Sequence, residues 1–318
     1  MTLSRDESSP SAIYSETPLV SVGIPTYNRA SLLDSRLLNV TSQTYRNIEI
    51  ILSDNASSDV DVLSVIERWR CKDSRIISYR QSYNIGSYAN FLYVLSKSSG
   101  PLFIWAADDD EWDLDFLTEC VTQIGQSQLI MPRMAIKYIQ SGQVDRIDYP
   151  SLSPNLSRYN NCANYLRNPQ PSLIYGLHRK EFLEKIIPLE AFDLADSLTV
   201  YLCVLNGGIV TGGLTEYRAG VPNATYEIKP FGRTDSRHKL SYRRYIVISI
   251  RETFRCHKLS YLERIKLIAI LIASITRTAV HLSNAYPDVA QPSHLALSRL
   301  IGFKRSLISW ASRIIRRR

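Results

Sequence analysis

Four short apolar runs alternate with segments of helical spacing over the first 130 residues, and this alternation restricts the fold more than any other feature of the chain. The runs are rich in β-branched and aliphatic residues and cover residues 19–24, 48–52, 76–79 and 102–107. The intervening segments repeat their apolar side chains with a helical period: residues 32–40, 62–69 and 88–95. Strands that alternate with helices build βαβ units, and continuous apolar runs are typical of parallel strands buried on both faces. We therefore expect an α/β fold with a Rossmann-like, mostly parallel sheet flanked by helices.

The rest of the chain has a different pattern. Strand-like pieces recur at residues 129–131, 133–139, 173–177 and 209–211, with one helix at 195–205. The glycine pairs Gly207-Gly208 and Gly212-Gly213 predict a short hairpin. Helical spacing returns over residues 239–258, 261–283 and 293–315. We expect a flexible N-terminal tail (1–18), one α/β domain (19–232) and a basic helical C-terminal region (233–318).

Charge separates the last region from the body. Residues 1–232 hold 20 Lys and Arg against 26 Asp and Glu, a balance of −6, whereas residues 233–318 hold 18 against 4, a balance of +14. Basic and apolar side chains interleave around Trp310, and a basic amphipathic helix with a Trp is typical of contact with an anionic membrane surface. Packing on the acidic body is the alternative. Without any accompanying DNA- or RNA-reading motif, we expect no nucleic-acid partner.

The sequence also indicates a compartment. No apolar run follows Arg5 near the start of the chain, so a secretory signal is not expected, and no uninterrupted run reaches the ~18–20 apolar residues of a spanning helix. The five cysteines are widely spaced and contain no Cys-x-x-Cys, which favours reduced thiols over a disulfide framework or a thiolate zinc site. We expect a cytoplasmic protein, peripheral on the cytosolic face of a membrane.

Polar residues follow each of the four predicted strands. They are Pro25, Thr26, Tyr27 and Asn28 after the first, Asp54 after the second, Arg80 after the third, and Asp108, Asp109 and Asp110 after the fourth. Open α/β sheets bind ligands at the carboxyl ends of their strands. These side chains are therefore expected to share one rim of the sheet.

The acidic residues on that rim each allow two interpretations. Adjacent carboxylates such as Asp108-Asp109-Asp110 can hold Mg²⁺ or Mn²⁺ together with substrate phosphates, or they can stabilise the first turn of a helix over residues 113–124. Asp54 could accept a hydrogen bond from the imide N–H of uracil, or it could belong to a turn before the next helix.

In order, the segments at residues 20–29 and 43–57, Asn84-Ile85-Gly86 and the Asp triplet resemble the nucleotide-binding half of the family-2 glycosyltransferases. The resemblance covers about 100 residues, and the ordered set is far more specific than any one motif. It implies a GT-A fold, a nucleotide-diphosphate-sugar donor that is most often a UDP-sugar, a divalent Mn²⁺ or Mg²⁺, and inversion at the anomeric carbon.

The resemblance also implies roles for single residues. Pro25, Thr26, Tyr27 and Asn28 match the motif that lines uracil and ribose, Asp54 matches the acid that binds the base, and Arg80 falls near a basic residue found beside it. The Asp-x-Asp metal motif places its second acid at Asp109. Its first acid falls on Ala107, a departure, so Asp108 is the candidate for the missing ribose contact. Asp109 and Asp110 are the candidate metal ligands.

A later motif suggests the catalytic base. Residues 192–198 resemble the family's acidic motif at a helix start, with Asp196 in place of its Asp and Ala195 where Glu is usual. An inverting transfer needs a general base to take the proton of the acceptor hydroxyl, and Asp196 is the candidate. Alternatively, it is an acid favoured by the dipole at a helix N-terminus.

These observations predict an inverting, metal-dependent glycosyltransferase that transfers a sugar from a UDP-sugar to a hydroxyl of a glycan or lipid-linked acceptor in surface polysaccharide synthesis. Two alternatives stay open: a sugar nucleotidyltransferase, although Pro25 to Arg29 contain no glycine-rich phosphate loop, and a non-catalytic, membrane-attached nucleotide-sugar binder. Core packing is the favoured interpretation for Trp105, Trp112 and Tyr88, and an ordinary position at a helix entry is favoured for His178.

Overall fold

The computed structural model describes residues 17–192, 194–221 and 242–285. Its strands are β1 (Val20–Thr26), β2 (Ile48–Asp54), β3 (Ile76–Arg80), β4 (Leu102–Trp105), β5 (Glu111–Trp112), β6 (Leu129–Tyr138), β7 (Val144–Arg146), β8 (Leu177–Arg179) and β9 (Ile209–Val221). The helices are α1 (Ala30–Thr41), α2 (Val60–Lys72), α3 (Ser87–Lys97), α4 (Phe116–Gln123), α5 (Arg158–Arg167), α6 (Lys180–Ile186), α7 (Ala195–Asn206), α8 (Tyr242–Arg255) and α9 (Tyr261–Ala285), with a 3₁₀ helix, η1 (Pro171–Tyr175).

The described strands form a single mixed sheet of nine strands. Eight follow the order β3-β2-β1-β4-β8-β6-β9-β5, and β7 pairs with β6. The first four strands are parallel, as predicted, and their inward side chains are almost fully buried. Beyond β4 the pairing alternates, because β8 runs antiparallel to both of its neighbours while β9 runs parallel to β6.

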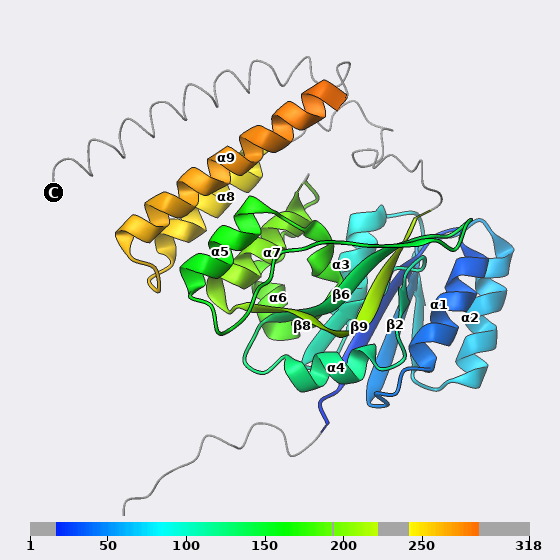
Figure 1. Ribbon diagram of the computed structural model, residues 1–318. Coiled ribbons are helices and arrows are strands. Elements are labelled where there is room, and N and C mark those ends of the chain that lie inside the picture. The colour runs from blue at the N-terminus through cyan, green and yellow to red at the C-terminus, as the bar shows by residue number, and fades with distance from the viewer. Residues whose placement is uncertain (1–16, 193, 222–241, 286–318) are drawn as a thin grey trace, which may run out of the picture.

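Helices cover both faces of the sheet, as Figure 1 shows. α1 packs on α2, and α3 packs on β1 and β2, whereas α4 lies against β6 and β9. α5 and α7 form a second helical group beside η1, and α8 and α9 pack against each other and onto this group. The buried core is continuous from the parallel strands to α7 and α9.

Two sequence predictions were wrong. The glycines near residue 210 do not turn a hairpin: β9 is one long strand, and its register against β6 jumps from Met131↔Thr211 to Arg133↔Glu216. Gly212, with a φ of +92°, lies in the resulting bulge, which places extra β9 residues opposite Pro132. Residues 173–177 are not a strand either, because η1 starts at Pro171 and the strand begins only at Leu177.

The C-terminal region agrees with the sequence where it is described. α8 and α9 fall within or close to the predicted helices 239–258 and 261–283. The predicted basic helix 293–315 lies outside the described residues. Among the helices that the structure describes, none is both long and apolar enough to cross a membrane.

Candidate active site

Three of the predicted site residues lie side by side at the carboxyl ends of neighbouring strands. In the parallel register of the sheet, Thr26 of β1 is opposite Asp54 of β2, and Asp54 is opposite Arg80 of β3. Each of the three is the last residue of its strand. The sheet therefore gathers a hydroxyl, a carboxylate and a guanidinium on one rim.

Asp54 is fully buried, and its carboxylate is held by several donors. Oδ1 accepts hydrogen bonds from the Ser57 backbone N–H at 3.0 Å and from the Ser57 hydroxyl at 2.5 Å. Oδ2 pairs with Arg80 at 2.8 Å. Because each carboxylate oxygen can accept two hydrogen bonds, Asp54 keeps the capacity to bind a further donor.

Backbone conformation in the adjoining loops is unusual. Asn28, two residues after β1, and Ala56, two residues after β2, both have positive φ, at 54° and 60°. The Asn28 N–H donates to the Ser57 hydroxyl at 2.9 Å, and the Asn28 side-chain oxygen accepts from the Asp59 N–H at 3.1 Å. These bonds offset the cost of conformations that non-glycine residues seldom adopt, and such conformations cluster at functional sites. Pro25 is buried, whereas Tyr27 is exposed at the same rim.

The acidic triplet joins this rim from the far side of β1. The Thr26 hydroxyl donates to Asp108 Oδ2 at 2.8 Å. Arg29 Nη1 then bridges Asp108 and Asp109, at 2.8 Å from each carboxylate. Burial, followed by the charge of Asp109, raises the pKa of Asp108, while Arg29 opposes that rise. Asp54 and the triplet thus flank Thr26 on one rim of the sheet.

Asp110 occupies a different environment from its two neighbours. Its side chain is buried, with Oδ2 accepting from the Tyr217 hydroxyl at 2.6 Å and Oδ1 from the Gly220 N–H at 3.2 Å. Burial and then the charge of Asp109 raise its pKa to about 7. Gly220 packs so closely that a Cβ there would lie 1.8 Å from the Asp109 carbonyl oxygen. Asp110 thus fixes the turn that presents Asp109.

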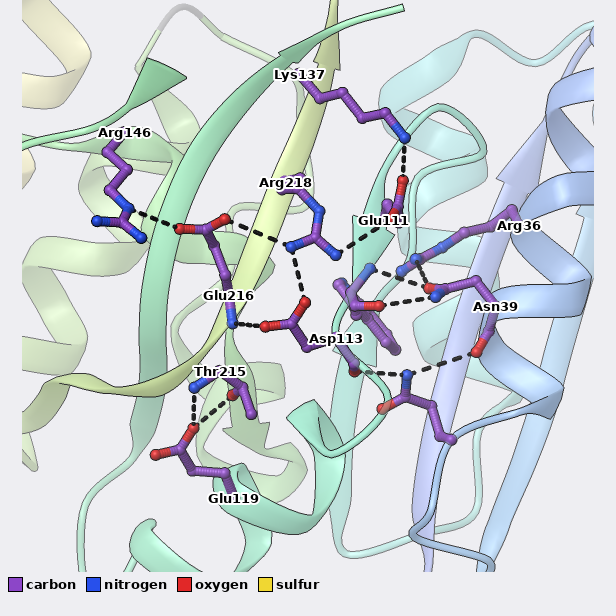
Figure 2. Close-up of polar contacts among 12 residues, drawn as sticks. Arg36, Asn39, Glu111, Asp113, Glu119, Lys137, Arg146, Thr215, Glu216 and Arg218 are labelled. Carbon is purple, nitrogen blue, oxygen red and sulfur yellow. Dashed lines mark hydrogen bonds and ion pairs between the residues drawn. The ribbon is translucent and has the colours of Figure 1, made fainter. Parts of the chain in front are cut away.

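Side chains of β9 and α1 hold the same turn from two sides, as Figure 2 shows. We call this set of contacts, made by Arg218 of β9 and by Arg36 and Asn39 of α1, the clamp. Arg218 of β9 pairs with Glu111 at 3.1 Å and with Asp113 at 2.7 Å. From the α1 side, the Asn39 amide bonds both backbone groups of Trp112, at 2.8 and 3.0 Å. The guanidinium of Arg218 is thus engaged by carboxylates of β5, of the turn that follows it and of β9.

A buried cation completes the α1 side of the clamp. Arg36 is 1% exposed, and its guanidinium carbon lies 3.9 Å from the centre of the Trp112 ring. Burial lowers its pKa to about 10, while the charge of Asp110 acts in the opposite direction. Cation–π contact and a nearby anion are what allow a guanidinium to be buried here.

The turn that carries Asp108, Asp109 and Asp110, which we call the acidic turn, also borders a cavity. About 390 Å³ of space lies between α1 and the turn, and side chains from both elements line it, together with Lys137 and Ile139 at the end of β6. Neither Thr26 nor Asp54 lines this cavity. It therefore adjoins the strand-end rim at the triplet and extends along α1 rather than over β2 and β3.

Asp196 enters from the second half of the chain. It stands in the first turn of α7, two residues after Leu194, whose φ of 69° makes a tight entry into the helix. Its Oδ1 accepts from the Ser197 N–H at 2.7 Å, and burial raises its pKa above the ordinary 3.8. The charge of Asp196 affects the pKa of Tyr175, as do the charges of all three members of the triplet. The two acidic groups therefore lie within electrostatic reach of one side chain.

Trp105 and Trp112 belong to the core, as expected, and His178 is buried there as well, whereas Tyr88 is half-buried. Trp105 and Trp112 are 2% and 1% exposed, and the Tyr88 hydroxyl donates to the Pro188 carbonyl at 2.6 Å. His178 is fully buried, contacts the Ile174 carbonyl at 2.7 Å through Nε2, and has its pKa lowered to about 4 by burial. These side chains pack the sheet and its covering helices.

Sequence analysis missed two residues of the site. Arg29 was read only as the end of a motif, although it is the ion-pair partner of Asp108 and Asp109. Tyr217 was given no role, although its hydroxyl binds Asp110. Each pair is separated by about 80 residues or more along the chain, so only the tertiary fold reveals it. No group of three or more His, Cys, Asp or Glu arranged to bind a metal ion occurs among the described residues.

The fold and this rim define an α/β protein of the GT-A glycosyltransferase type. The crystal structure of S. aureus TarS 1–349 in complex with UDP-GlcNAc superposes with a TM-score of 0.65 at 18% identity, covering 87% of this chain and 79% of that one. The mannosyltransferase PcManGT from Pyrobaculum calidifontis, in complex with GDP-Man and Mn²⁺, gives 0.52 at 17% identity, covering 94% and 84%. At such identities the likeness concerns the fold.

Sequence comparison finds a family model that matches part of the chain. Residues 21–175 match the Glycosyl transferase family 2 model. The GalNAc(5)-diNAcBac-PP-undecaprenol beta-1,3-glucosyltransferase of Campylobacter jejuni is 37% identical over 95 residues. That match covers 30% of this chain and 30% of the relative. Asp196 lies beyond the residues matched by the family model.

Proposed function

We propose that this protein is an inverting glycosyltransferase that moves a sugar from a UDP-sugar to a hydroxyl of a lipid-linked glycan. One observation carries the proposal: Thr26, Asp54 and Arg80 stand in register on adjacent strands, and Asp108 binds Thr26 on the same rim. The relative from C. jejuni is named for a glucosyl transfer to a diphosphate-linked polyprenol, and TarS binds UDP-GlcNAc. Both names agree with this choice of donor and acceptor.

On this proposal the rim binds the nucleotide. Asp54 accepts the uracil imide N–H, and Arg80, 2.8 Å away, orients that carboxylate. Pro25, Thr26, Tyr27 and Asn28 line the base and ribose, and Asp108, fixed by Thr26 and Arg29, contacts the ribose hydroxyls. A nucleoside diphosphate placed in this way directs its phosphates toward Asp109.

The residues at the triplet fit a hard divalent cation. Asp109 is 23% exposed, and only its Oδ2 makes a contact with another described residue. Mg²⁺ is typically held by one or two carboxylates together with substrate phosphates, so Asp109 would be the direct ligand. Asp110, although predicted as a second ligand, is buried beneath Tyr217 and Gly220 and would position Asp109. When bound, Mn²⁺ or Mg²⁺ would stabilise the charge of the departing diphosphate.

Asp196 serves as the general base. Its carboxylate takes the proton of the acceptor hydroxyl, the resulting oxygen bonds to the anomeric carbon from the face opposite UDP, and the bond from that carbon to the β-phosphate oxygen breaks. Among the described residues, the hydrogen bond to the Asp196 carboxylate comes from its own helix, through the Ser197 N–H. A carboxylate of this kind remains available to an incoming hydroxyl.

Transfer can be tested directly. Purified protein with Mn²⁺ should move sugar from UDP-Glc or UDP-GlcNAc to a synthetic polyprenyl-diphosphate glycan, and EDTA should abolish the transfer. Asp196→Asn should bind UDP as tightly as wild type while kcat falls roughly 10²- to 10⁴-fold, the usual contribution of a general base. A wild-type protein that neither transfers nor hydrolyses any nucleotide sugar would contradict the proposal, and unchanged turnover in the variant would remove Asp196 as the base.

A further inference from the structure

Tyr175 occupies a position between the two acidic parts of the site. It ends η1, which packs against α7, the helix whose first turn carries Asp196. On its other side the Tyr175 ring stacks on the Tyr217 ring, with centroids 5.9 Å apart and an interplanar angle of 13°. Tyr217 in turn reaches Asp110 through its hydroxyl. Tyr175 is therefore tied by packing to both the acidic turn and α7.

Electrostatics agree with this placement. Burial raises the pKa of Tyr175, and the charges that raise it further are, in decreasing order, those of Asp110, Asp109, Asp196 and Asp108. The raised pKa keeps the phenol neutral and able to donate a hydrogen bond across the working pH range.

The ring of Tyr175 is fixed, whereas its hydroxyl is not engaged by any residue that the structure describes. Phe91 contacts the ring edge-on at 6.3 Å, and Tyr217 covers one face. Within the ranges that the structure describes, the Tyr175 hydroxyl makes no hydrogen bond, whereas Tyr88, Tyr165, Tyr201 and Tyr217 nearby all do. The side chain is half-buried, and a half-buried phenol without a protein partner is available to a ligand.

We propose that the Tyr175 hydroxyl binds a hydroxyl group of the transferred sugar and so helps to select the donor. The inference rests on the proposed transfer reaction. In that reaction the sugar must lie between the diphosphate, held at Asp109, and the base Asp196, which is where packing places Tyr175. A rigid phenol there can discriminate among sugars, because a buried polar group left unpaired disfavours a sugar that lacks its partner.

Tyr175→Phe tests the proposal, because the change removes the hydroxyl and keeps the ring stacked. We expect kcat/KM for the best donor found in a nucleotide-sugar screen to fall about tenfold, the order of one lost hydrogen bond, while the Kd for UDP alone and the Tm stay as in wild type. Monodeoxy analogues of that donor should identify the contact. Wild type should discriminate against one of them, and the variant should not.

Tyr93→Phe is the matched control. Tyr93 also lies in an aromatic pair, with its ring centroid 5.6 Å from that of Tyr79, but it belongs to α3 and not to the acidic turn or α7. This change should therefore leave donor selection unaltered. Equal losses for UDP and the UDP-sugar, or a lowered Tm, in Tyr175→Phe would reveal a structural role and overturn the inference, as would an unchanged kcat/KM. Absence of transfer by the wild type would instead contradict the proposed function.

Discussion

The pH dependence of turnover should report the burial of Asp196. Its pKa lies above 3.8 in the folded protein because burial disfavours the ionised form. A general base acts only when ionised, so kcat should fall as pH drops through this raised pKa, and the acid limb of the profile should lie above pH 3.8. Steady-state assays between pH 4 and 8 would measure the limb. An acid limb at or below 3.8 would contradict the assignment.

Stability gives a second measurement on the same residue. Because folding raises the pKa, the contribution of Asp196 to stability is complete below its unfolded pKa and is lost as pH rises through the folded pKa. At neutral pH, Asp196→Asn should therefore keep or increase the Tm while activity falls. A residue that served only the dipole of α7 would behave in the opposite way, since its neutralisation would cost about 0.3–1 kcal/mol.

Individual residues differ in how far sequence could predict them. Asp54 and Thr26 were predictable because strand register follows from the apolar runs, and parallel strands bring their last residues together. Asp108, Asp109 and Asp110 look alike in the sequence, yet one binds Thr26, one is partly exposed and one is buried under Tyr217. The difference between these three environments depends on contacts with β9, which begins about 100 residues later. No local sequence pattern indicates those contacts.

At the scale of elements, the pairing of β5 with β9 joins the two halves of the site. Sequence favoured a helix from residue 113 and a hairpin near residue 210, so it missed both β5 and the full length of β9. A two-residue strand has no periodicity to detect, and the glycines of a bulge resemble those of a turn. The parallel strands and most helices were predictable because each carries its own apolar repeat.

Arg218 should contribute strongly to this pairing. Its guanidinium, with the side chain 15% exposed, joins Glu111 and Asp113 from β5 and the following turn to Glu216 of β9. Arg218→Met should lower the free energy of unfolding by about 1–3 kcal/mol, the order expected for hydrogen bonds to charged groups. Because the same pairing places Asp109, the variant should also need more Mn²⁺ for half-maximal activity. Urea unfolding and a metal titration would measure the two effects.

Arg146→Ala is the control for that variant. Arg146 also pairs with Glu216, at 3.4 Å, but its side chain is 79% exposed. Exposed pairs contribute little, typically under 1 kcal/mol, so this change should leave both the unfolding free energy and the metal titration close to wild type. Equal effects of the two substitutions would mean that the network in Figure 2 does not position the acidic turn.

At the scale of the whole molecule, the site is assembled from two parts of the chain, the half with the parallel strands and the half that follows it. The parallel half supplies the rim of Thr26, Asp54, Arg80 and Asp108, which lies within the family match at residues 21–175. The second half supplies Asp196, the β9 clamp and the helices α5, α7, α8 and α9. The C. jejuni relative is matched over only 30% of its own length.

Charge on the whole molecule leads to the last prediction. Residues 293–318 carry seven Lys and Arg and no Asp or Glu, while residues 1–232 have a balance of −6. If the basic segment binds anionic lipid, at about 1 kcal/mol per basic residue near the surface, its deletion should release the protein from phosphatidylglycerol vesicles in a sedimentation assay. Transfer to a short-chain, water-soluble acceptor should be retained, because the elements that form the site all precede α8. Vesicle binding that survives the deletion would assign attachment to another surface, and loss of transfer to the soluble acceptor would mean that the segment supports the acidic body instead.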